Sequence, residues 1–515
     1  MHRQWLRLLD PMIHDLRQDA GNEPAGRLRL AKALNGRCLH EEARTVLEAT
    51  FAKAGGDPGP LVSDFWFERI MALGDHASEE EMEALHRRLL ALREEQPDSA
   101  PVLRNLGFIR ILQQCGEEAE RDLRRSLALD GADPRALELM GLLCVQRDNC
   151  QEAKTWLLKA LSLQPRDPRT LRLLGITCQH LADFKCAESQ FLAALEVDPA
   201  YFWGWHSLGE LLLRKGEMED GLRCIHRARS IEARESASYF ILSELFTEQG
   251  HLELAMGELH QLTALAPPAD ALAEAYTMLG EIRRDLGDTE GATSYFTLAA
   301  ETDPTAADPW AALGDMARGA DQWDEALRCY REALARKPDA ADLQVQMGYI
   351  MLKNGQFQDG EQLFLTALES DPGEYSAYLG LSECYRNLQR PEDQFAMVKQ
   401  AQTLAPEDPD VWNAMGVAME VRGMCREATD AYERALALAP LHRKAANNLG
   451  FLLEKRIQAG EADLHARATE AWKRRLLICR DEGQSLKMAT EHLARLGVAE
   501  DTIRLWLERD PTPGA

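Results

Sequence analysis

Apolar residues recur with helical spacing along most of the chain, and the pattern itself repeats. Leucine, methionine and aromatic residues fall at i, i+3, i+4 and i+7, which places them on one face of a helix. Most units of the pattern end in a phrase such as Leu-Gln-Pro or Leu-Ala-Pro, with Gly131 and Ala233 at two places where the proline is missing. The prolines of these phrases lie 34 residues apart, except for two gaps of 68 and one of 37. A fixed period of 34 predicts an array of helix pairs. The prolines are Pro97, Pro165, Pro199, Pro267, Pro304, Pro338, Pro372, Pro406 and Pro440.

Small residues recur in phase with this period. A Leu-Gly or Met-Gly pair comes early in nine units, a small residue follows twelve positions after the glycine, and an aromatic residue often comes four positions later. Small residues let two antiparallel helices approach closely, while aromatic and leucine side chains fill the seam between them. The early glycines are Gly107, Gly141, Gly175, Gly209, Gly280, Gly314, Gly348, Gly416 and Gly450. A second set is expected between the two helices, where a helix C-cap needs positive φ: Gly216, Gly250, Gly287, Gly355 and Gly423.

This pattern resembles the tetratricopeptide repeat family over most of the chain. The resemblance implies an all-α fold, a right-handed superhelical solenoid of antiparallel helix pairs. Eleven repeats are expected to begin at residues 100, 134, 168, 202, 236, 273, 307, 341, 375, 409 and 443, with two degenerate repeats from about 24 and near 66. The expected domains are N-terminal capping helices and degenerate repeats at 1–99, a continuous array at 100–480, and C-terminal capping helices with a tail at 481–515. The segment at 55–60 is expected to be a loop.

Length and charge change the picture in two ways. For globular domains of roughly 150 residues, 515 residues would predict three or four domains, but the period replaces them with one array. The net charge of −25 argues against nucleic acid as the main partner. No apolar run approaches 18 residues, so we expect no membrane insertion. The chain start lacks a secretory pattern and the eleven cysteines are scattered, which predicts reduced cysteines and a cytoplasmic protein.

Catalytic signatures are missing from the sequence. There is no phosphate-binding glycine loop, zinc-protease helix or complete nucleophile elbow. We therefore expect no enzyme activity, no cofactor and no metal. Two cysteine pairs, Cys144 with Cys150 and Cys178 with Cys186, are interpreted as small buried hydrophobic residues rather than metal ligands.

The resemblance implies that the first helix of each repeat lines a concave groove that binds a peptide or protein segment. Basic and aromatic groove positions are expected at Arg104, Phe108, Arg135, Arg169, Arg172, Trp203, His206 and Arg214. Acidic groove positions are expected at Glu244, Glu248, Glu274, Glu281, Asp285, Asp308 and Asp315. Later positions are mixed and include Asp342, Tyr349, Lys353, Glu383, Arg386, Asn387, Asn413, Phe451 and Lys455.

Segment charges agree with this division. Residues 100–231 hold 18 basic and 18 acidic side chains, whereas 232–318 hold 16 acidic and 4 basic. An acidic groove would attract a Lys- or Arg-bearing segment and speed its encounter. The alternative is that these charges only solvate a long solenoid.

A local basic cluster is a second candidate surface. Arg467, Lys473, Arg474 and Arg475 lie close together in the last repeat. They predict a docking patch for an acidic partner or for another copy of the chain. The alternative is a helix whose cations face water while Trp472 packs in the core.

Two variants of the family are poor matches. The carboxylate clamp that binds acidic C-terminal peptides is represented only by the fragment Lys444, Asn447 and Asn448. An asparagine ladder, as in arrays of protein O-glycosyltransferases, is present at only two of eleven positions, Asn105 and Asn448.

The sequence as a whole predicts a protein–protein interaction scaffold or adaptor that binds a peptide or protein segment. Two alternatives stay open. One is a regulatory or substrate-presenting subunit of a separate enzyme, such as a glycosyltransferase. The other is a self-assembling scaffold, a homo-oligomer in which the basic patch of one copy meets an acidic groove of another.

Overall fold

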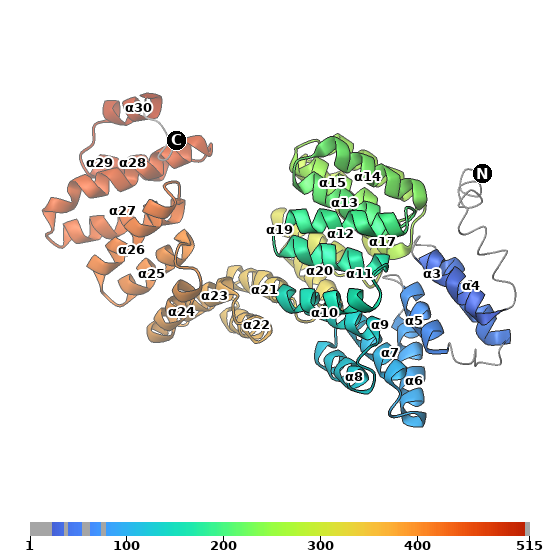
Figure 1. Ribbon diagram of the computed structural model, residues 1–515. Coiled ribbons are helices and arrows are strands. Elements are labelled where there is room, and N and C mark those ends of the chain that lie inside the picture. Colours follow the sequence, from blue (N-terminus) through green and yellow to red (C-terminus); the bar gives the residue numbers. More distant parts are fainter. Residues whose placement is uncertain (1–22, 36–39, 54–61, 74–78, 510–515) are drawn as a thin grey trace. The chain divides into compact units, whose positions relative to one another are not determined.

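The computed structural model describes residues 23–35, 40–53, 62–73 and 79–509. All regular structure in these residues is helical, with 28 α-helices, a short 3-10 helix and no strand. Helices that follow one another in sequence lie side by side in pairs (Figure 1). The expected N-terminal cap up to residue 22, the loop at 55–60 and the tail beyond 509 lie outside the described residues. The all-α prediction is confirmed.

The chain divides into two compact units. Unit 1 comprises residues 1–303. Its helices are α3 Pro24–Asn35, α4 His40–Lys53, α5 Val62–Leu73, α6 Glu79–Glu95, α7 Ala100–Leu112, α8 Gly116–Leu129, α9 Pro134–Gln146, α10 Cys150–Leu163, α11 Pro168–His180, α12 Phe184–Val197, α13 Phe202–Arg214, α14 Met218–Ile231, α15 Ala237–Glu248, α16 Leu252–Ala264, α17 Ala269–Asp285 and α18 Thr289–Thr302.

Unit 2 comprises residues 304–515. Its helices are α19 Asp308–Gly319, α20 Trp323–Arg336, α21 Ala341–Lys353, α22 Phe357–Ser370, α23 Tyr375–Asn387, α24 Pro391–Leu404, α25 Pro409–Val421, α26 Cys425–Leu438, α27 Arg443–Gln458, η3 Ala462–Leu464, α28 His465–Asp481, α29 Lys487–Arg495 and α30 Glu500–Arg509. The boundary at residue 303 falls inside the expected continuous array. The predicted division at residues 99 and 480 stays a prediction.

Ten of the eleven expected repeats begin within one residue of an observed helix start. The exception is α17, which begins at Ala269, four residues before the expected position, since the helix starts directly after Pro267 and Pro268. The insertion expected in the last repeat is present as the end of α27 and the short η3. Two helix pairs, α3 with α4 and α5 with α6, occupy the places of the degenerate repeats.

The in-phase glycines mark the points where paired helices meet. A Cβ atom added at Gly280 would lie 2.5 Å from the buried ring of Phe296, sixteen residues later. One added at Gly107 would lie 2.6 Å from Leu123, and one at Gly348 would lie 2.7 Å from Phe364. Real Cβ contacts are longer than this. The glycine therefore allows the large side chain of the second helix to lie directly against the backbone of the first.

Substitution of an in-phase glycine should separate the paired helices. Gly280→Ala is expected to lower the free energy of unfolding by about 1–3 kcal/mol, because the added methyl group overpacks against Phe296. The measurement is urea unfolding followed by helical circular dichroism. The matched control is Gly257→Ala in the neighbouring α16, where nothing lies within 4 Å of the added Cβ. Alanine there should stabilise the helix by about 0.5–1 kcal/mol. Equal effects of the two substitutions would contradict the packing role of Gly280.

Candidate protein-binding groove

The arginines expected to bind a partner in unit 1 are paired within the chain. The guanidinium group of Arg104 donates to Asp133 Oδ2 at 3.1 Å, and both side chains are buried. Arg135 contacts Glu138 at 2.8 Å and Asp167 at 3.2 Å. Burial alone would raise the pKa of Asp167. The charges of Arg135 and Arg169 and hydrogen bonds from Thr170 outweigh this effect, so the pKa lies below its ordinary value. These cations are therefore held by carboxylates of the same chain.

A phenylalanine and a glutamate from α5 close this cluster. The Phe67 ring centroid lies 5.3–5.4 Å from the guanidinium carbons of Arg104, Arg135 and Arg169. Glu68 is fully buried, and its Oε1 lies 3.4 Å from Arg169. Cations over an aromatic face are attracted by its quadrupole, and more strongly where water is excluded. The cluster joins four first helices, α5, α7, α9 and α11.

The aromatic positions expected in the unit 1 groove are also engaged. Phe108 is buried, with its ring 5.2 Å from that of Phe67. Arg172 lies 5.1 Å from the Trp203 ring and donates to Ser207 Oγ. His206 is buried against Phe202 and Trp203. Because these side chains pack inside the chain, we leave them out of the proposed binding surface.

Arg214 differs from the other basic positions. Its side chain is exposed, and it pairs with Glu210 one helical turn earlier at 2.9 Å. A surface pair of this kind contributes little to stability. Arg214 alone is not a binding surface.

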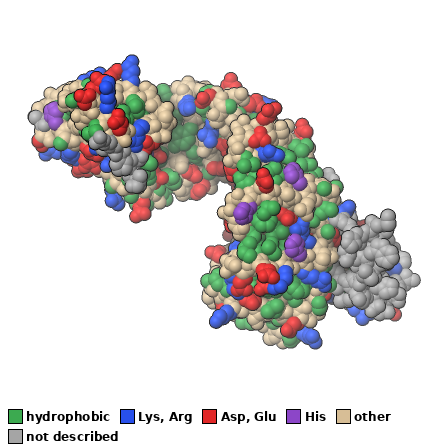
Figure 2. Space-filling model, turned by 90° about the horizontal axis from the view of Figure 1, so that it is seen from above, with side chains coloured by type: hydrophobic (Ala, Val, Ile, Leu, Met, Phe, Trp, Pro, Cys, Tyr) green, Lys and Arg blue, Asp and Glu red, His purple; other side chains and the backbone are tan. Residues whose placement is uncertain are grey.

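The acidic positions of unit 1 face solvent. Glu244, Glu248, Glu274, Glu281 and Asp285 are all exposed on α15 and α17. The remaining two predicted positions, Asp308 and Asp315, belong to unit 2. Acidic and basic side chains are interspersed over the face seen in Figure 2, so a single charged residue does not identify a site. Asp308 is exposed, whereas Asp315 is half-buried and accepts from Tyr330 OH at 2.7 Å and from Arg318 at 3.2 Å. The predicted acidic middle of the groove thus lies on two separate units and includes one carboxylate that is engaged within the chain.

The four residues of the predicted basic patch do not act as one set. Arg467 contacts Glu433 on α26, the second helix of the preceding repeat, and Lys473 lies 4.9 Å from the Trp506 ring. Arg475 contacts Cys479, and burial together with Arg443 lowers the pKa of Arg475. Arg474 lines a hollow of about 340 Å³ together with Arg467. A docking patch made of all four therefore stays a prediction.

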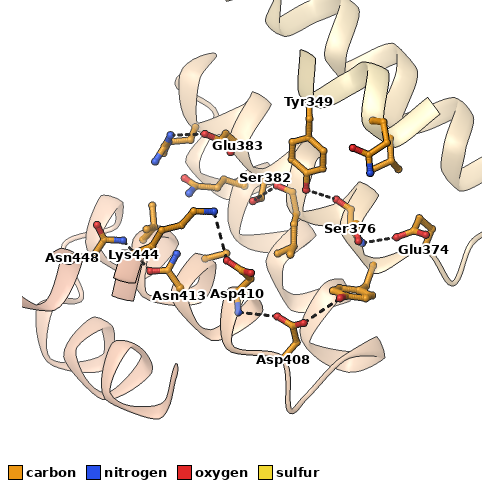
Figure 3. Close-up of a pocket in the computed structure, with 18 of the residues that line it drawn as sticks. Tyr349, Glu374, Ser376, Ser382, Glu383, Asp408, Asp410, Asn413, Lys444 and Asn448 are labelled. Carbon is orange, nitrogen blue, oxygen red and sulfur yellow. Dashed lines mark hydrogen bonds and ion pairs between the residues drawn. The ribbon is translucent and has the colours of Figure 1, made fainter. Parts of the chain in front are cut away.

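A larger hollow lies in unit 2. It has a volume of about 550 Å³ and is lined mainly by the first helices of four successive repeats, α21, α23, α25 and α27. Figure 3 shows side chains from these helices directed toward one another across it. We call this hollow the unit 2 groove. It brings together five mixed positions expected from the sequence: Asp342, Tyr349, Glu383, Arg386 and Asn413.

Polar contacts link neighbouring repeats along the unit 2 groove (Figure 3). Tyr349 OH donates to the carbonyl oxygen of Ser376 at 3.0 Å. Tyr375 OH donates to Asp408 Oδ2 at 3.1 Å, while Asp408 Oδ1 caps the start of α25. Burial raises the pKa of Tyr349, so its hydroxyl stays protonated and keeps this contact. The groove walls are thereby held in place before any ligand binds.

Asp410 sits at the wall formed by α25. Its carboxylate lies 3.2 Å from His442 Nε2 and 3.7 Å from Lys444 Nζ. Hydrogen bonding to His442 and the charge of Lys444 lower the pKa of Asp410. Asp410 is therefore an anion at neutral pH.

The cysteines differ from the prediction at one place. Cys178 and Cys186 form a disulfide, although reduced cysteines were expected throughout. Their Cα atoms are 5.9 Å apart on the facing helices α11 and α12, a separation that a disulfide spans. The spacing of eight residues is not a recognised motif, so the sequence pattern did not reveal it. Cys144 and Cys150 are buried and free, as expected.

One cluster of metal-binding residue types was not expected. The ligand atoms of Asp148, Cys150 and His180 lie within 4.8 Å of one another, and Asp148 and His180 are exposed. Three ligands leave a tetrahedral zinc site incomplete. We assign no metal to this cluster, and the expectation of no metal stays a prediction.

A sequence model of the tetratricopeptide repeat family matches residues 267–489. This range contains all residues of the unit 2 groove. The glycine period and the paired helices extend the same architecture through unit 1. The chain contains tetratricopeptide repeats. The resemblance noted from the repeat motifs is therefore confirmed.

Two solved structures resemble the chain at low identity. One is the APC/C hetero-tetramer Cut9–Hcn1, with 13% identity, a TM-score of 0.40, and coverage of 84% of this chain and 96% of that chain. The other is PilF of Pseudomonas aeruginosa, with 15% identity, a TM-score of 0.32, and coverage of 41% and 94%. Both TM-scores lie below 0.5, so neither likeness says what this chain binds. No curated protein matches the chain.

The tetratricopeptide repeats support a protein-interaction scaffold in general terms. Proteins of this family typically have no catalytic activity of their own, and the expectation that this chain is not an enzyme stays a prediction. Among the described residues, none of the helices has the length and apolarity needed to cross a membrane.

The Phe67 cluster should dominate the stability of the first repeats. Phe67→Ala is expected to lower the free energy of unfolding by about 3–5 kcal/mol, because it removes a ring that is 3% exposed. Hydrogen exchange of α5, α7, α9 and α11 is the measurement. Phe184 in α12 is the control, since it is 45% exposed and its truncation should change stability by less than about 0.5 kcal/mol. Unchanged protection in Phe67→Ala would show that the arginines hold these helices without the ring.

His206 should make the stability of unit 1 depend on pH. Burial lowers its pKa to about 4, below the ordinary value of 6.5. The unfolded chain therefore binds a proton more readily, and stability falls as the pH drops from 6.5 to 4, at up to about 1.4 kcal/mol per pH unit. His206→Gln should lose this part of the dependence. Urea midpoints of both proteins at pH 7.5 and 4.5 provide the comparison, and parallel losses in the two would contradict it.

Proposed function

We propose that the chain is a protein-interaction scaffold that binds a segment of another protein in the unit 2 groove. The observation that carries this is the hollow of about 550 Å³ lined by α21, α23, α25 and α27. A groove that crosses four repeats suits an extended segment, because each repeat offers one set of side chains at a regular interval. The family match over residues 267–489 supports the choice of this unit.

The exposed acidic residues of unit 1 form a second proposed contact surface. Glu244, Glu248, Glu274, Glu281 and Asp285 lie on the first helices of two successive repeats, where the family presents groove residues. Their negative charge favours a segment that carries lysine or arginine and speeds its approach. A partner long enough to contact both units would gain affinity from the second contact.

The two alternatives from the sequence differ in their support. A regulatory or substrate-presenting subunit of an enzyme would use the same groove, so it is a special case of the scaffold. Self-assembly through the basic cluster is disfavoured, because Arg467 and Lys473 already contact residues of their own unit. The proposed compartment is the cytoplasm.

Site-specific cross-linking tests the groove assignment. A photo-reactive amino acid is placed at Gln346 or Glu383, which line the groove, or at Glu369 or Glu427 on the second helices α22 and α26. The full chain is expressed in its native cell and irradiated. We expect the groove positions to cross-link a shared protein partner, with at least about tenfold less adduct from the second-helix positions, because only the groove encloses a bound segment.

The partner segment is then identified by mass spectrometry of the adducts. Adducts that form equally from all four positions, or only from α22 and α26, would show that the partner binds elsewhere. Adducts between two copies of the chain would favour self-assembly over the scaffold.

A further inference from the structure

The repeat formed by α23 and α24 breaks the packing pattern of its neighbours. Ser382 stands at the position of the in-phase glycine, and Gln394 at the position that is alanine or glycine in the repeats before and after it. Val398 replaces the aromatic residue that is Phe364 in the preceding repeat and Tyr432 in the following one. Val398 is smaller than these rings, so the seam has room for the longer side chain of Gln394. Ser382, Gln394 and Val398 are all buried.

Gln394 brings a polar group without a partner to the unit 2 groove. Its side chain lines the groove and is 2% exposed, and its Oε1 has no hydrogen-bond partner in the described part of the chain. Asn447 Oδ1, in the same groove, also lacks a partner among the described residues. A buried acceptor without a donor destabilises a folded protein unless something else supplies the donor. Two such acceptors in one hollow point to a ligand with N–H groups.

Three donors of the groove, on Arg386, Lys444 and Asn448, are already engaged. Arg386 donates to Glu383 at 3.1 Å, and Asn448 Nδ2 donates to Asn413 Oδ1 at 2.9 Å. Lys444 Nζ lies 3.7 Å from Asp410. Figure 3 shows the Asn448 and Lys444 side chains turned toward these acceptors. These three donors are thus directed at acceptors of the chain itself rather than at a bound carboxylate.

The charge of the groove favours the same kind of ligand. Its lining holds five carboxylates and two cationic side chains, an excess of three negative charges. The carboxylates are Asp342, Glu374, Glu383, Asp408 and Asp410. Asp342 is exposed at one wall, and Asp410 lies at another. A negative hollow raises the local concentration of cations and repels acidic segments.

We propose that the unit 2 groove recognises a cationic side chain, arginine in preference to lysine, in the segment that it binds. This proposal rests on the proposed function and adds the chemistry of the bound residue. A guanidinium group has five N–H donors and no acceptor, which matches a site with unpartnered acceptors and surplus carboxylates. Lysine has the same charge but only three donors on a compact ammonium group. The orphan amide oxygen of Gln394 accepts from the guanidinium, and the carboxylates balance its charge.

Selection from a random peptide library tests the proposal with the full chain as bait. The expected result is enrichment of peptides that carry arginine at one position, with lysine weaker. Replacing that arginine by citrulline, which keeps the shape but loses the charge, should weaken binding about tenfold or more in a fluorescence anisotropy titration. Gln394→Ala should weaken the arginine peptide by a similar factor, because it removes an acceptor of the guanidinium N–H groups.

Two further variants keep the test independent of folding defects. Alanine is the residue of the following repeat at the Gln394 position, and circular dichroism checks that the variant is folded. Asp342→Asn changes one exposed groove carboxylate and should also weaken the arginine peptide, whereas Glu369→Lys on α22 should not.

The outcomes separate this proposal from the proposed function. Selection of peptides that are acidic or bind through a C-terminal carboxylate would overturn the cationic ligand and leave groove binding intact. Equal binding of arginine and citrulline peptides would also overturn the cationic ligand and leave groove binding intact. If no peptide is selected, or if selected peptides bind unchanged when Glu383 and Asp410 are both changed to lysine, groove binding itself is wrong and this proposal falls with it.

Discussion

The close approach of two helices at a glycine is the contact on which the rest of this structure depends. At each in-phase glycine the backbone of the first helix lies against a large buried side chain of the second, as Gly280 lies against Phe296 and Gly416 against Tyr432. This contact orients the first helix so that one face packs and the other is left for the groove. The repeats that keep the contact thus share the same packing between their two helices. The repeat of α23 and α24 is the instructive exception, since Ser382 and Gln394 place polar groups in the seam itself.

A second constraint is that each buried arginine of unit 1 needs a carboxylate beside it. A buried guanidinium needs an acceptor, and the carboxylates that cap the first helices supply it. Asp133 caps α9 and accepts from Arg104 of the preceding repeat, while Asp167 caps α11 and accepts from Arg135. Each of these aspartates therefore caps the N-terminus of one helix and also binds an arginine of the repeat before it. The acidic residues on α15 and α17 lie at the surface instead.

The sequence predicted the repeats far better than the site. The period and the in-phase glycines fix which residues begin each helix, because both are local properties of one repeat. Whether Arg104 and Phe108 are buried or exposed depends instead on Phe67 and Asp133. These two residues belong to other repeats, and a repeat-by-repeat alignment does not show that they lie beside Arg104 and Phe108. The disulfide between Cys178 and Cys186 was missed for a related reason, since it joins facing helices rather than a short motif. Gln394 is visible in the sequence, because the repeats before and after it have glycine and alanine at its position. A search for positions that depart from the repeat pattern would have found it.

The contact between Glu68 and Arg169 joins residues 101 positions apart. Repeat arrays ordinarily contact only their nearest neighbours, so they can unravel one repeat at a time from an end. A cluster that ties α5 to α7, α9 and α11 removes that freedom, because none of these helices can detach without exposing the buried charges of the others. The beginning of the array should consequently open as a single cooperative block, whereas the repeats of unit 2, which are linked from one to the next, have no such lock in their described residues. The chain thus combines one stretch that is joined across four repeats with another whose described repeats are linked from one to the next.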